Sequence, residues 1–234
     1  MKLAISQPTF LPWAGYFGLI NFTDEFVFLD DVQYSKRGWQ QRNCIKVNNK
    51  SFNLSVPVIS KNKYNQKINE VLIDSSSKFI DNHKKTIEYN YKKSKYYSNY
   101  VEEIFKIYDC KHQRLIDLNF DLITKICELL KINISFVKSS ALKTKSSKSG
   151  LILEICKLRQ CNTYISTLGA KEYLINDSEE FKKNSIQLQY FKFKNFQYNQ
   201  IGKDFIKNLS IIDLLFNLGP TTLDYINKNF YIYE

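Results

Sequence analysis

The sequence lacks any long hydrophobic run. Its longest apolar stretch, residues 209–218, contains Asp213 and Asn217 and falls short of the ~20 apolar residues that a membrane helix needs. The first residues show neither an extended apolar region nor a small-residue cleavage site, so a secretory signal is not indicated. We therefore expect a cytoplasmic protein with no transmembrane segment.

Residues that build metal centres and nucleophilic triads are also scarce. The chain has only two histidines, and its five cysteines are scattered, with no CxxC pair among them. This spacing favours reduced structural thiols over a zinc site, and we expect no metal. No Ser-His-Asp or Cys-His arrangement is evident, so a covalent acyl-enzyme is not indicated.

Lysine and aromatic residues are abundant instead. The 234 residues carry a formal net charge of +11, and a basic surface favours polyanions such as nucleotides or RNA. The same richness in Lys, Asn, Ile, Tyr and Phe is typical of an AT-rich genome, so both interpretations of the charge stay open. We find no internal repeat and no domain boundary, and we expect a single domain over residues 1–234.

The order of apolar segments predicts the fold class. Two short apolar runs, 2–6 and 26–29, flank helical spacing over 15–21, which is the pattern of a βαβ unit in a buried parallel sheet. Further strands are predicted at 44–47, 52–56, 71–73, 132–137, 163–165 and 186–193, and helices at 79–91, 97–108, 114–130, 150–160, 211–218 and 223–227. The prediction is an α/β fold with a Rossmann-like, open, mostly parallel sheet flanked by helices, a helical middle and a C-terminal extension.

A low-complexity patch rich in lysine and serine covers residues 139–149. It is either a solvated loop or a basic flap over a phosphate-bearing ligand.

The first candidate site segment follows the first strand. It contains Gln7, Pro8, Trp13, Gly15 and Tyr16 and leads into the first helix. Ligands of open α/β sheets bind at such strand ends, and free amides at a helix start suit phosphate. A rigid, proline-shaped connection is the structural alternative.

A second candidate segment follows the second strand. Asp30 and Asp31 end that strand, and Lys36, Trp39 and Arg42 come soon after. One aspartate could act as a general base while the other orients a ribose, and the cations could contact phosphate. Capping and turn formation are the alternative roles of the acids.

The third candidate segment is a strand-to-helix turn with Ser166, Thr167, Gly169, Lys171 and Tyr173. Hydroxyls, backbone amides and a lysine can hold a phosphate there, although an ordinary capped helix start has the same residues. Since parallel strands end at one edge of a sheet, we expect the three segments to converge.

These segments resemble the WbqC-like family. The similar residues are 7–17, 28–33, 39–43, 54–58, 118–119, 164–166, 169–174, 198–200 and 209–213. Members are mostly encoded among surface-polysaccharide genes, including O-antigen clusters, and the resemblance implies a glycine transferase role.

A more distant likeness is to nucleotidyltransferase-like folds. Trp13 and Tyr16 stand where those folds carry the histidines of an HxGH motif, and Ser166-Thr167 stands at their second signature. A neutral indole and a phenol cannot stabilise phosphate charge as imidazolium does, so nucleotidyl transfer is not favoured.

We therefore expect acyl or aminoacyl transfer to an amino sugar or its nucleotide-linked form. Asp30 or Asp31 would be the base, and Gln7 or amides near Gly15 would stabilise the oxyanion. The expected partners are a nucleotide-linked sugar and an activated acyl donor, either an aminoacyl-tRNA or a thioester. A non-catalytic nucleotide- or RNA-binding module and a residual nucleotidyltransferase or ligase activity remain the alternatives, and the oligomeric state is left open.

Overall fold

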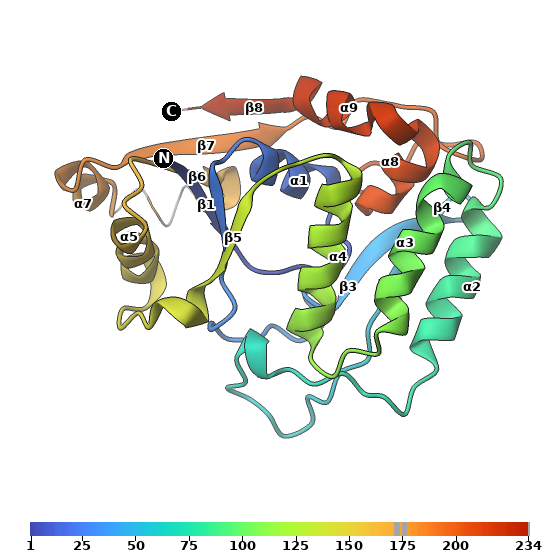
Figure 1. The fold of residues 1–234 in the computed structure, drawn as a ribbon, viewed down its shortest axis with the longest axis horizontal. Coiled ribbons are helices and arrows are strands. Elements are labelled where there is room, and N and C mark those ends of the chain that lie inside the picture. Colours follow the sequence, from blue (N-terminus) through green and yellow to red (C-terminus); the bar gives the residue numbers. More distant parts are fainter. Residues whose placement is uncertain (171–173, 175–176, 234) are drawn as a thin grey trace.

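A six-stranded sheet forms the centre of the molecule, with the strand order β5-β2-β1-β6-β7-β8 (Figure 1). The computed structural model describes residues 1–170, 174 and 177–233. The strands are β1 (Lys2–Ser6), β2 (Glu25–Phe28), β5 (Ser135–Lys138), β6 (Thr163–Thr167), β7 (Gln187–Phe193) and β8 (Phe230–Tyr233). Neighbours from β5 to β7 run parallel, whereas β8 pairs antiparallel with β7. The predicted open, mostly parallel sheet is confirmed.

Alternate side chains of the strands enter two hydrophobic clusters, one on each face of the sheet. On β1, Leu3 and Ile5 belong to one cluster and Ala4 to the other. On β6, Tyr164 and Ile165 divide in the same way. A period of two with both sets buried is what a central parallel strand produces. Both faces therefore require a layer of helices.

Those layers differ in size. The helices are α1 (Ala14–Asn21), α2 (Phe79–Tyr91), α3 (Tyr97–Asp109), α4 (Leu115–Leu129), α5 (Lys148–Leu158), α7 (Ser178–Lys183), α8 (Ile211–Leu218) and α9 (Thr222–Lys228). Helices α5 and α7 supply Ile155 and Phe181 to the smaller cluster, and they lie apart from the other helices in Figure 1. Helices α1 to α4, α8 and α9 contribute to the larger cluster on the opposite face.

A separate two-stranded hairpin precedes the helical middle. Strands β3 (Arg42–Val47) and β4 (Lys50–Ser55) pair antiparallel. Asn48 and Asn49 join them with φ angles of 49° and 60°, and asparagine tolerates this left-handed region better than most residues. The strands predicted at 44–47 and 52–56 are thus the two strands of this hairpin.

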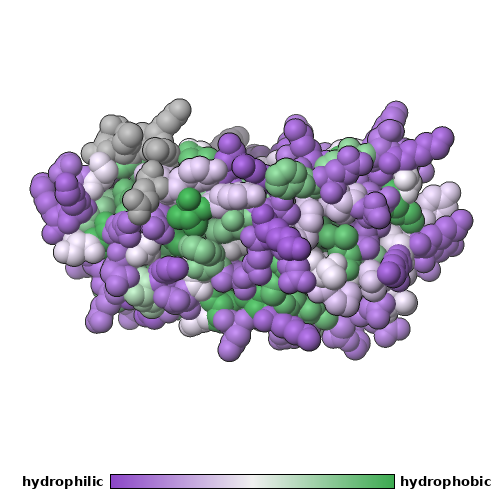
Figure 2. Space-filling model, turned by 90° about the horizontal axis from the view of Figure 1, so that it is seen from above, coloured by the Kyte–Doolittle hydropathy of each residue, from purple (hydrophilic) through white to green (hydrophobic). Residues whose placement is uncertain are grey.

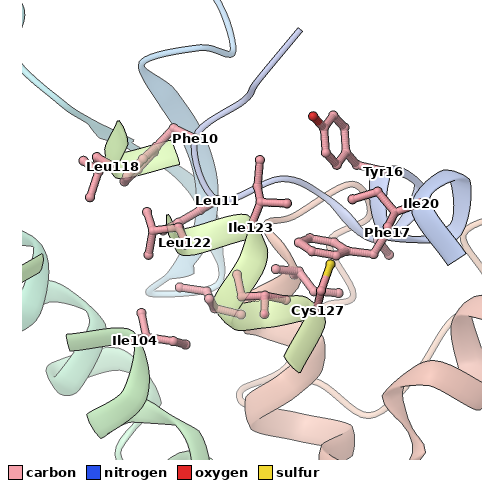
Figure 3. Close-up of a cluster of buried hydrophobic side chains, with 14 of the residues drawn as sticks. Phe10, Leu11, Tyr16, Phe17, Ile20, Ile104, Leu118, Leu122, Ile123 and Cys127 are labelled. Carbon is pink, nitrogen blue, oxygen red and sulfur yellow. The ribbon is translucent and has the colours of Figure 1, made fainter. Parts of the chain in front are cut away.

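Helix α4 packs its apolar stripe against the segment that follows β1. Leu118, Leu122 and Ile123 lie beside Phe10 and Leu11, and all five are buried (Figure 3). Burying one such side chain contributes about 1.5–3 kcal/mol, so this contact fixes the path of the chain between β1 and α1.

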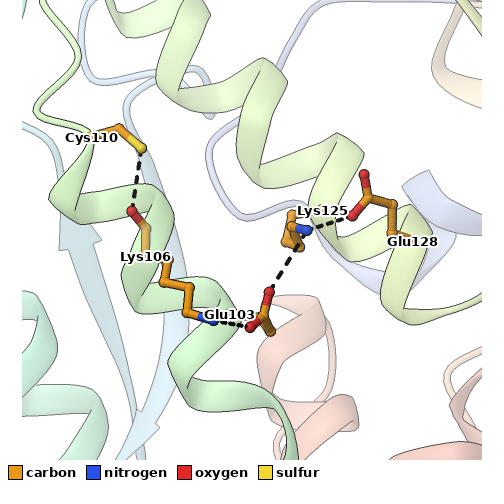
Figure 4. Close-up of polar contacts among 5 residues, drawn as sticks. All are labelled: Glu103, Lys106, Cys110, Lys125 and Glu128. Atoms are coloured by element: carbon orange, nitrogen blue, oxygen red, sulfur yellow. Dashed lines mark hydrogen bonds and ion pairs between the residues drawn. The ribbon is translucent and has the colours of Figure 1, made fainter.

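Ion pairs lie beside the contact between α3 and α4 (Figure 4). The Lys125 ammonium lies 3.7 Å from a Glu103 carboxylate oxygen and 2.5 Å from a Glu128 oxygen. Glu128 is exposed, and Lys125 and Glu103 are partly exposed, so these ion pairs contribute little and the apolar stripe holds the two helices together.

One predicted strand is wrong, and two short elements were not predicted. Residues 71–73 form no strand: Leu72 and Ile73 make only isolated bridges, to Arg114 and Val58. Three apolar residues are too few for periodicity to decide, and here they form part of the link between β4 and α2, with Val71 and Ile73 buried and Leu72 exposed. Strand β8 and helix α7 were not predicted, because they too are short for a periodic pattern to show.

The Lys/Ser patch is an ordered connection at both of its ends. Ser139–Leu142 forms a short 3₁₀ turn, and the Glu154 carboxylate accepts hydrogen bonds from the amides of Lys145 and Ser146. Across residues 1–170, 174 and 177–233, none of the helices combines the length and the hydrophobicity needed to cross a membrane.

Candidate functional site

The segment leaving β1, residues 7–13, is held by side-chain amides from other parts of the chain. The Asn43 amide donates to the Leu11 carbonyl at 2.8 Å. The Asn119 side-chain amide, on the buried face of α4, donates to the Pro8 carbonyl at 3.4 Å and to the Gln40 carbonyl at 2.8 Å. A loop whose carbonyls point inward is stable only when those carbonyls find donors. The two asparagines therefore set the shape of this segment.

Residues 39 and 40 run alongside the same segment. The backbone amide of Phe10 donates to the Trp39 carbonyl at 2.9 Å. The side-chain amide of Gln40 donates to the side-chain oxygen of Gln7 at 2.6 Å. The second predicted segment, which follows β2, therefore contacts the first, which follows β1, through Trp39 and Gln40.

A hollow of about 430 Å³ opens beside this segment. We call it the aromatic pocket, because four of its ten lining residues are aromatic. Its lining residues are Ser6, Thr9, Trp13, Tyr16, Leu19, Trp39, Asn43, Thr167, Phe191 and Asn208. Ser6 and Thr167 end neighbouring parallel strands, so the pocket lies at the carboxyl edge of the sheet, where open α/β sheets bind ligands.

Trp13 and Trp39 are the two tryptophans of the chain, and both line the aromatic pocket. The Trp13 indole packs on Gly15 so closely that a Cβ there would stand 2.3 Å from a ring carbon. It also meets Phe193 edge-to-face, with ring centroids 5.4 Å apart. Trp39 is 57% exposed, which is unusual for so large an apolar ring.

Tyr16 lines the aromatic pocket, and its hydroxyl points away from the other labelled side chains in Figure 3. That hydroxyl donates to the Gln7 carbonyl at 3.1 Å. Burial raises the pKa of Tyr16 well above its ordinary value, an effect that a hydrogen bond with Ser6 opposes. Tyr16 is therefore a neutral phenol near pH 7 and cannot serve there as a base.

The third predicted segment contributes one side chain to the aromatic pocket. Thr167 lines it, while Ser166 is buried with 5% exposure and Gly169 is exposed. Lys171 and Tyr173 lie outside the described residues, so the structure does not place them.

Asp30 and Asp31 lie at the same sheet edge but not in the aromatic pocket. The Asp30 carboxylate is 1% exposed and accepts hydrogen bonds from the Ser140 amide at 2.9 Å and the Ser140 hydroxyl at 2.7 Å. The Ser139 hydroxyl contacts both aspartates. Asp30 thereby anchors the 3₁₀ turn after β5, which is the capping role that sequence reasoning kept as the alternative.

Asp30 also borders a second hollow, of about 450 Å³, together with Arg114 and Lys138. The three predicted segments therefore share one edge but do not form one pocket. The reason is the strand order: β2 lies on the far side of β1 from β6, so Asp30 faces β5 instead.

The predicted cations and Pro8 also lie outside the lining of the aromatic pocket. Lys36 is exposed, with its ammonium 5.3 Å from the Tyr64 ring centre. Arg42 begins β3, and its Nε is buried without a hydrogen-bond partner. Pro8 is buried in the segment after β1.

Sequence reasoning missed Ser6, Leu19, Asn43, Phe191 and Asn208 as pocket residues. Asn43 stands inside a family-like string and could have been found from it. Asn208 has a φ of 61°, a backbone feature that no sequence pattern revealed. In the described part of the chain, no group of three or more His, Cys, Asp or Glu residues is placed to hold a metal ion.

A mostly parallel sheet with helices on both faces, and a pocket over the carboxyl ends of its strands, defines an α/β protein of Rossmann-like architecture. The model of the WbqC-like protein family matches residues 7–225. The chain is also 34% identical over 227 residues to Uncharacterized protein Rv1507c of Mycobacterium tuberculosis (strain ATCC 25618 / H37Rv), an alignment that covers 96% of this chain and 97% of that protein.

The chain therefore belongs to the WbqC-like protein family, and the resemblance seen in the sequence is confirmed. No solved structure matches it.

Proposed function

We propose that this protein is a transferase of surface-polysaccharide assembly. It binds a nucleotide-linked amino sugar in the aromatic pocket and transfers an acyl or aminoacyl group, such as glycyl, to the sugar amine. The observation that carries the proposal is the placement of both tryptophans in a pocket at the carboxyl edge of the sheet. Flat indole faces stack well on nucleobases and on sugar rings.

The polar residues of the pocket suit recognition of such a ligand. Thr9, Thr167 and Asn208 supply hydroxyl and amide groups among the aromatic walls. A few polar groups placed among apolar ones are what orient a small ligand. The volume of about 430 Å³ is within the usual range for such ligands.

The reaction follows from direct attack by the amine. The nitrogen of the sugar forms a C–N bond with the acyl carbon, and the C–O bond to tRNA or the C–S bond to a thiol breaks. The amine proton passes to the leaving group or to water. No histidine, cysteine or carboxylate lines the pocket among the described residues, so the proposal needs no covalent acyl-enzyme.

Tryptophan fluorescence tests the binding step directly, because both tryptophans of the chain line the pocket. Titration with uridine, guanosine and thymidine diphosphate amino sugars should give a saturable change in emission. Trp39→Phe should keep the Trp13 response, and Trp13→Phe should keep the Trp39 response. Emission that stays constant across the whole panel would contradict the proposal.

Mass spectrometry tests the transfer step. Incubation with the sugar that binds, together with charged tRNA or an acyl thioester, should raise the sugar mass by one acyl residue. Unchanged sugar masses with every donor, despite binding, would favour the second candidate: a non-catalytic nucleotide-binding protein of glycan assembly. No histidine, cysteine or carboxylate among the described residues lines the pocket, and this observation favours the second candidate.

A further inference from the structure

A basic hollow lies at the turn between α2 and α3, away from the aromatic pocket. It has a volume of about 400 Å³. Its lining includes Lys93, Ser94, Lys95 and Tyr96 of the turn and Asn199 and Gln200 of the segment before α8. The two pockets share no lining residue. We call this second one the Lys93–Lys95 hollow.

Ser94 is the feature that packing alone does not explain. The residue is 9% exposed, and its buried hydroxyl oxygen makes no hydrogen bond in the structure. The backbone amides of Lys93 and Lys95, on either side of it, also donate to no acceptor in the part of the chain described. A buried hydroxyl without a partner carries a free-energy cost, and a bound acceptor would remove it.

The charge around the hollow has one sign. Lys93 and Lys95 are exposed, and neither forms an ion pair with any described residue. None of the described residues that line the hollow is acidic. Helix α3 begins directly after it at Tyr97, with no side-chain cap, so the positive end of the helix dipole adds to the attraction for an anion.

The hollow is built on a rigid frame. The Tyr96 amide donates to the Phe216 carbonyl at 2.9 Å, and its ring packs on Gly219, where a Cβ would stand 2.4 Å from the ring. On the opposite wall, the Gln200 amide donates to the Tyr198 hydroxyl at 3.0 Å. Donors held in place before binding lose little entropy when a ligand arrives.

We propose that the Lys93–Lys95 hollow binds a phosphate group. Two ammonium groups, a hydroxyl and backbone amides match the several acceptor oxygens of a phosphate better than the two of a carboxylate. The α2–α3 turn lies at the right-hand end of the molecule in Figure 1, and hydrophilic side chains dominate that end in Figure 2. The site does not depend on the function proposed for the aromatic pocket.

The test is an amide chemical-shift titration of the protein with pyrophosphate. The double variant Lys93→Gln/Lys95→Gln removes both ammonium groups, and Ser94→Ala removes the hydroxyl. The matched control is Lys61→Gln/Lys63→Gln, which removes the same charge from an exposed loop on the lower side of the molecule in Figure 1. Far-UV circular dichroism checks that each variant is folded.

Pyrophosphate should shift the amides of residues 93–97 in the wild type. The affinity should fall about tenfold or more in Lys93→Gln/Lys95→Gln, because charged hydrogen bonds are lost, and less in Ser94→Ala. The control should bind like the wild type. No shift at residues 93–97, or an equal loss in the control, would overturn the proposal.

Two further titrations identify the source of the phosphate. If Lys93→Gln/Lys95→Gln weakens binding of labelled tRNA, the site holds an RNA backbone. If it weakens binding of uridine diphosphate instead, the site holds a nucleotide. A pyrophosphate response without either effect points to a small phosphate ester and still supports the site.

Discussion

At the residue scale, the arrangement of the aromatic pocket depends on a missing side chain. Gly15 leaves the space that the Trp13 indole occupies, with ring carbons 2.3–2.7 Å from where a Cβ would stand. Real atoms do not approach so closely, so any larger residue at position 15 must displace the indole. The indole in turn forms one wall of the pocket.

Gly15→Ala should therefore lower stability, although alanine is normally favoured over glycine within a helix by roughly 0.5–1 kcal/mol. It should also shift the tryptophan emission and weaken binding of the nucleotide-linked sugar. Gly150→Ala in α5 is the control, because a Cβ there meets its nearest neighbour at an ordinary 3.5 Å. Urea unfolding and emission spectra measure both effects. Equal stability changes in the two variants would rule out the steric argument.

Substitution of Asp30 distinguishes a structural role of this residue from a catalytic one. Asp30→Ala should reduce the free energy of unfolding by about 1–3 kcal/mol, because the Ser140 amide and hydroxyl lose their acceptors. Asp31→Ala should cost less, since Asp31 is half-buried and has one contact, with Ser139. Chemical denaturation gives both values. A variant Asp30→Ala that is as stable as the wild type but inactive would restore the predicted catalytic role.

At the scale of elements, a buried acid joins three separate parts of the chain. Asp213 of α8 accepts the hydroxyl of Tyr91 from α2 at 2.7 Å and the hydroxyl of Tyr198 at 2.6 Å. The Tyr91 hydroxyl in turn accepts the Lys46 amide of β3 at 2.8 Å. Burial raises the pKa of Asp213, and the two phenols oppose that rise by bonding to its charged form.

Tyr91→Phe should cost about 1–3 kcal/mol of unfolding free energy, because it leaves the Lys46 amide without an acceptor and Asp213 with one donor fewer. Tyr89→Phe, two residues earlier on the same helix, is the control. Tyr89 is 74% exposed, and loss of its hydroxyl should change stability by less than about 0.5 kcal/mol. Thermal or urea unfolding compares the two, and similar losses would show that the network contributes nothing special.

At the scale of the whole molecule, His83 ties stability to pH. Its ring contacts the Ser55 carbonyl at 3.2 Å and the Tyr108 hydroxyl at 3.3 Å, between α2, α3 and β4. Burial lowers the pKa of His83 to about 4, from about 6.5 in an unfolded chain. The unfolded state therefore binds the proton more readily, and acid favours unfolding.

The contribution of His83 should be complete above about pH 6.5 and should decline as the pH falls towards 4. The loss should be at most about 1.4 kcal/mol per pH unit. Denaturation curves measured across this range should show a shallower pH dependence for His83→Gln than for the wild type. Parallel curves for the two proteins would exclude His83 as the source.

Much of the fold follows from the sequence because local periodicity reports burial. The apolar runs at 2–6 and 26–29 can be satisfied only by strands covered on both faces, and the spacing over 79–91 and 211–218 matches α2 and α8 residue for residue. Short elements escape this reasoning. Residues 71–73 and 230–233 are both apolar. Residues 230–233 form a strand that pairs with β7, whereas residues 71–73 make only isolated bridges.

The site divides in the same way. The sequence by itself determined that three polar junctions stand at one edge of the sheet, because parallel strands share a direction. Only the tertiary structure decided which side chains meet there. Asp30 is bound by Ser139 and Ser140, 109 and 110 positions away, and Trp13 and Trp39 share a pocket with Phe191 and Asn208. Contacts across such separations depend on strand order and packing, and neither leaves a periodic trace in the sequence.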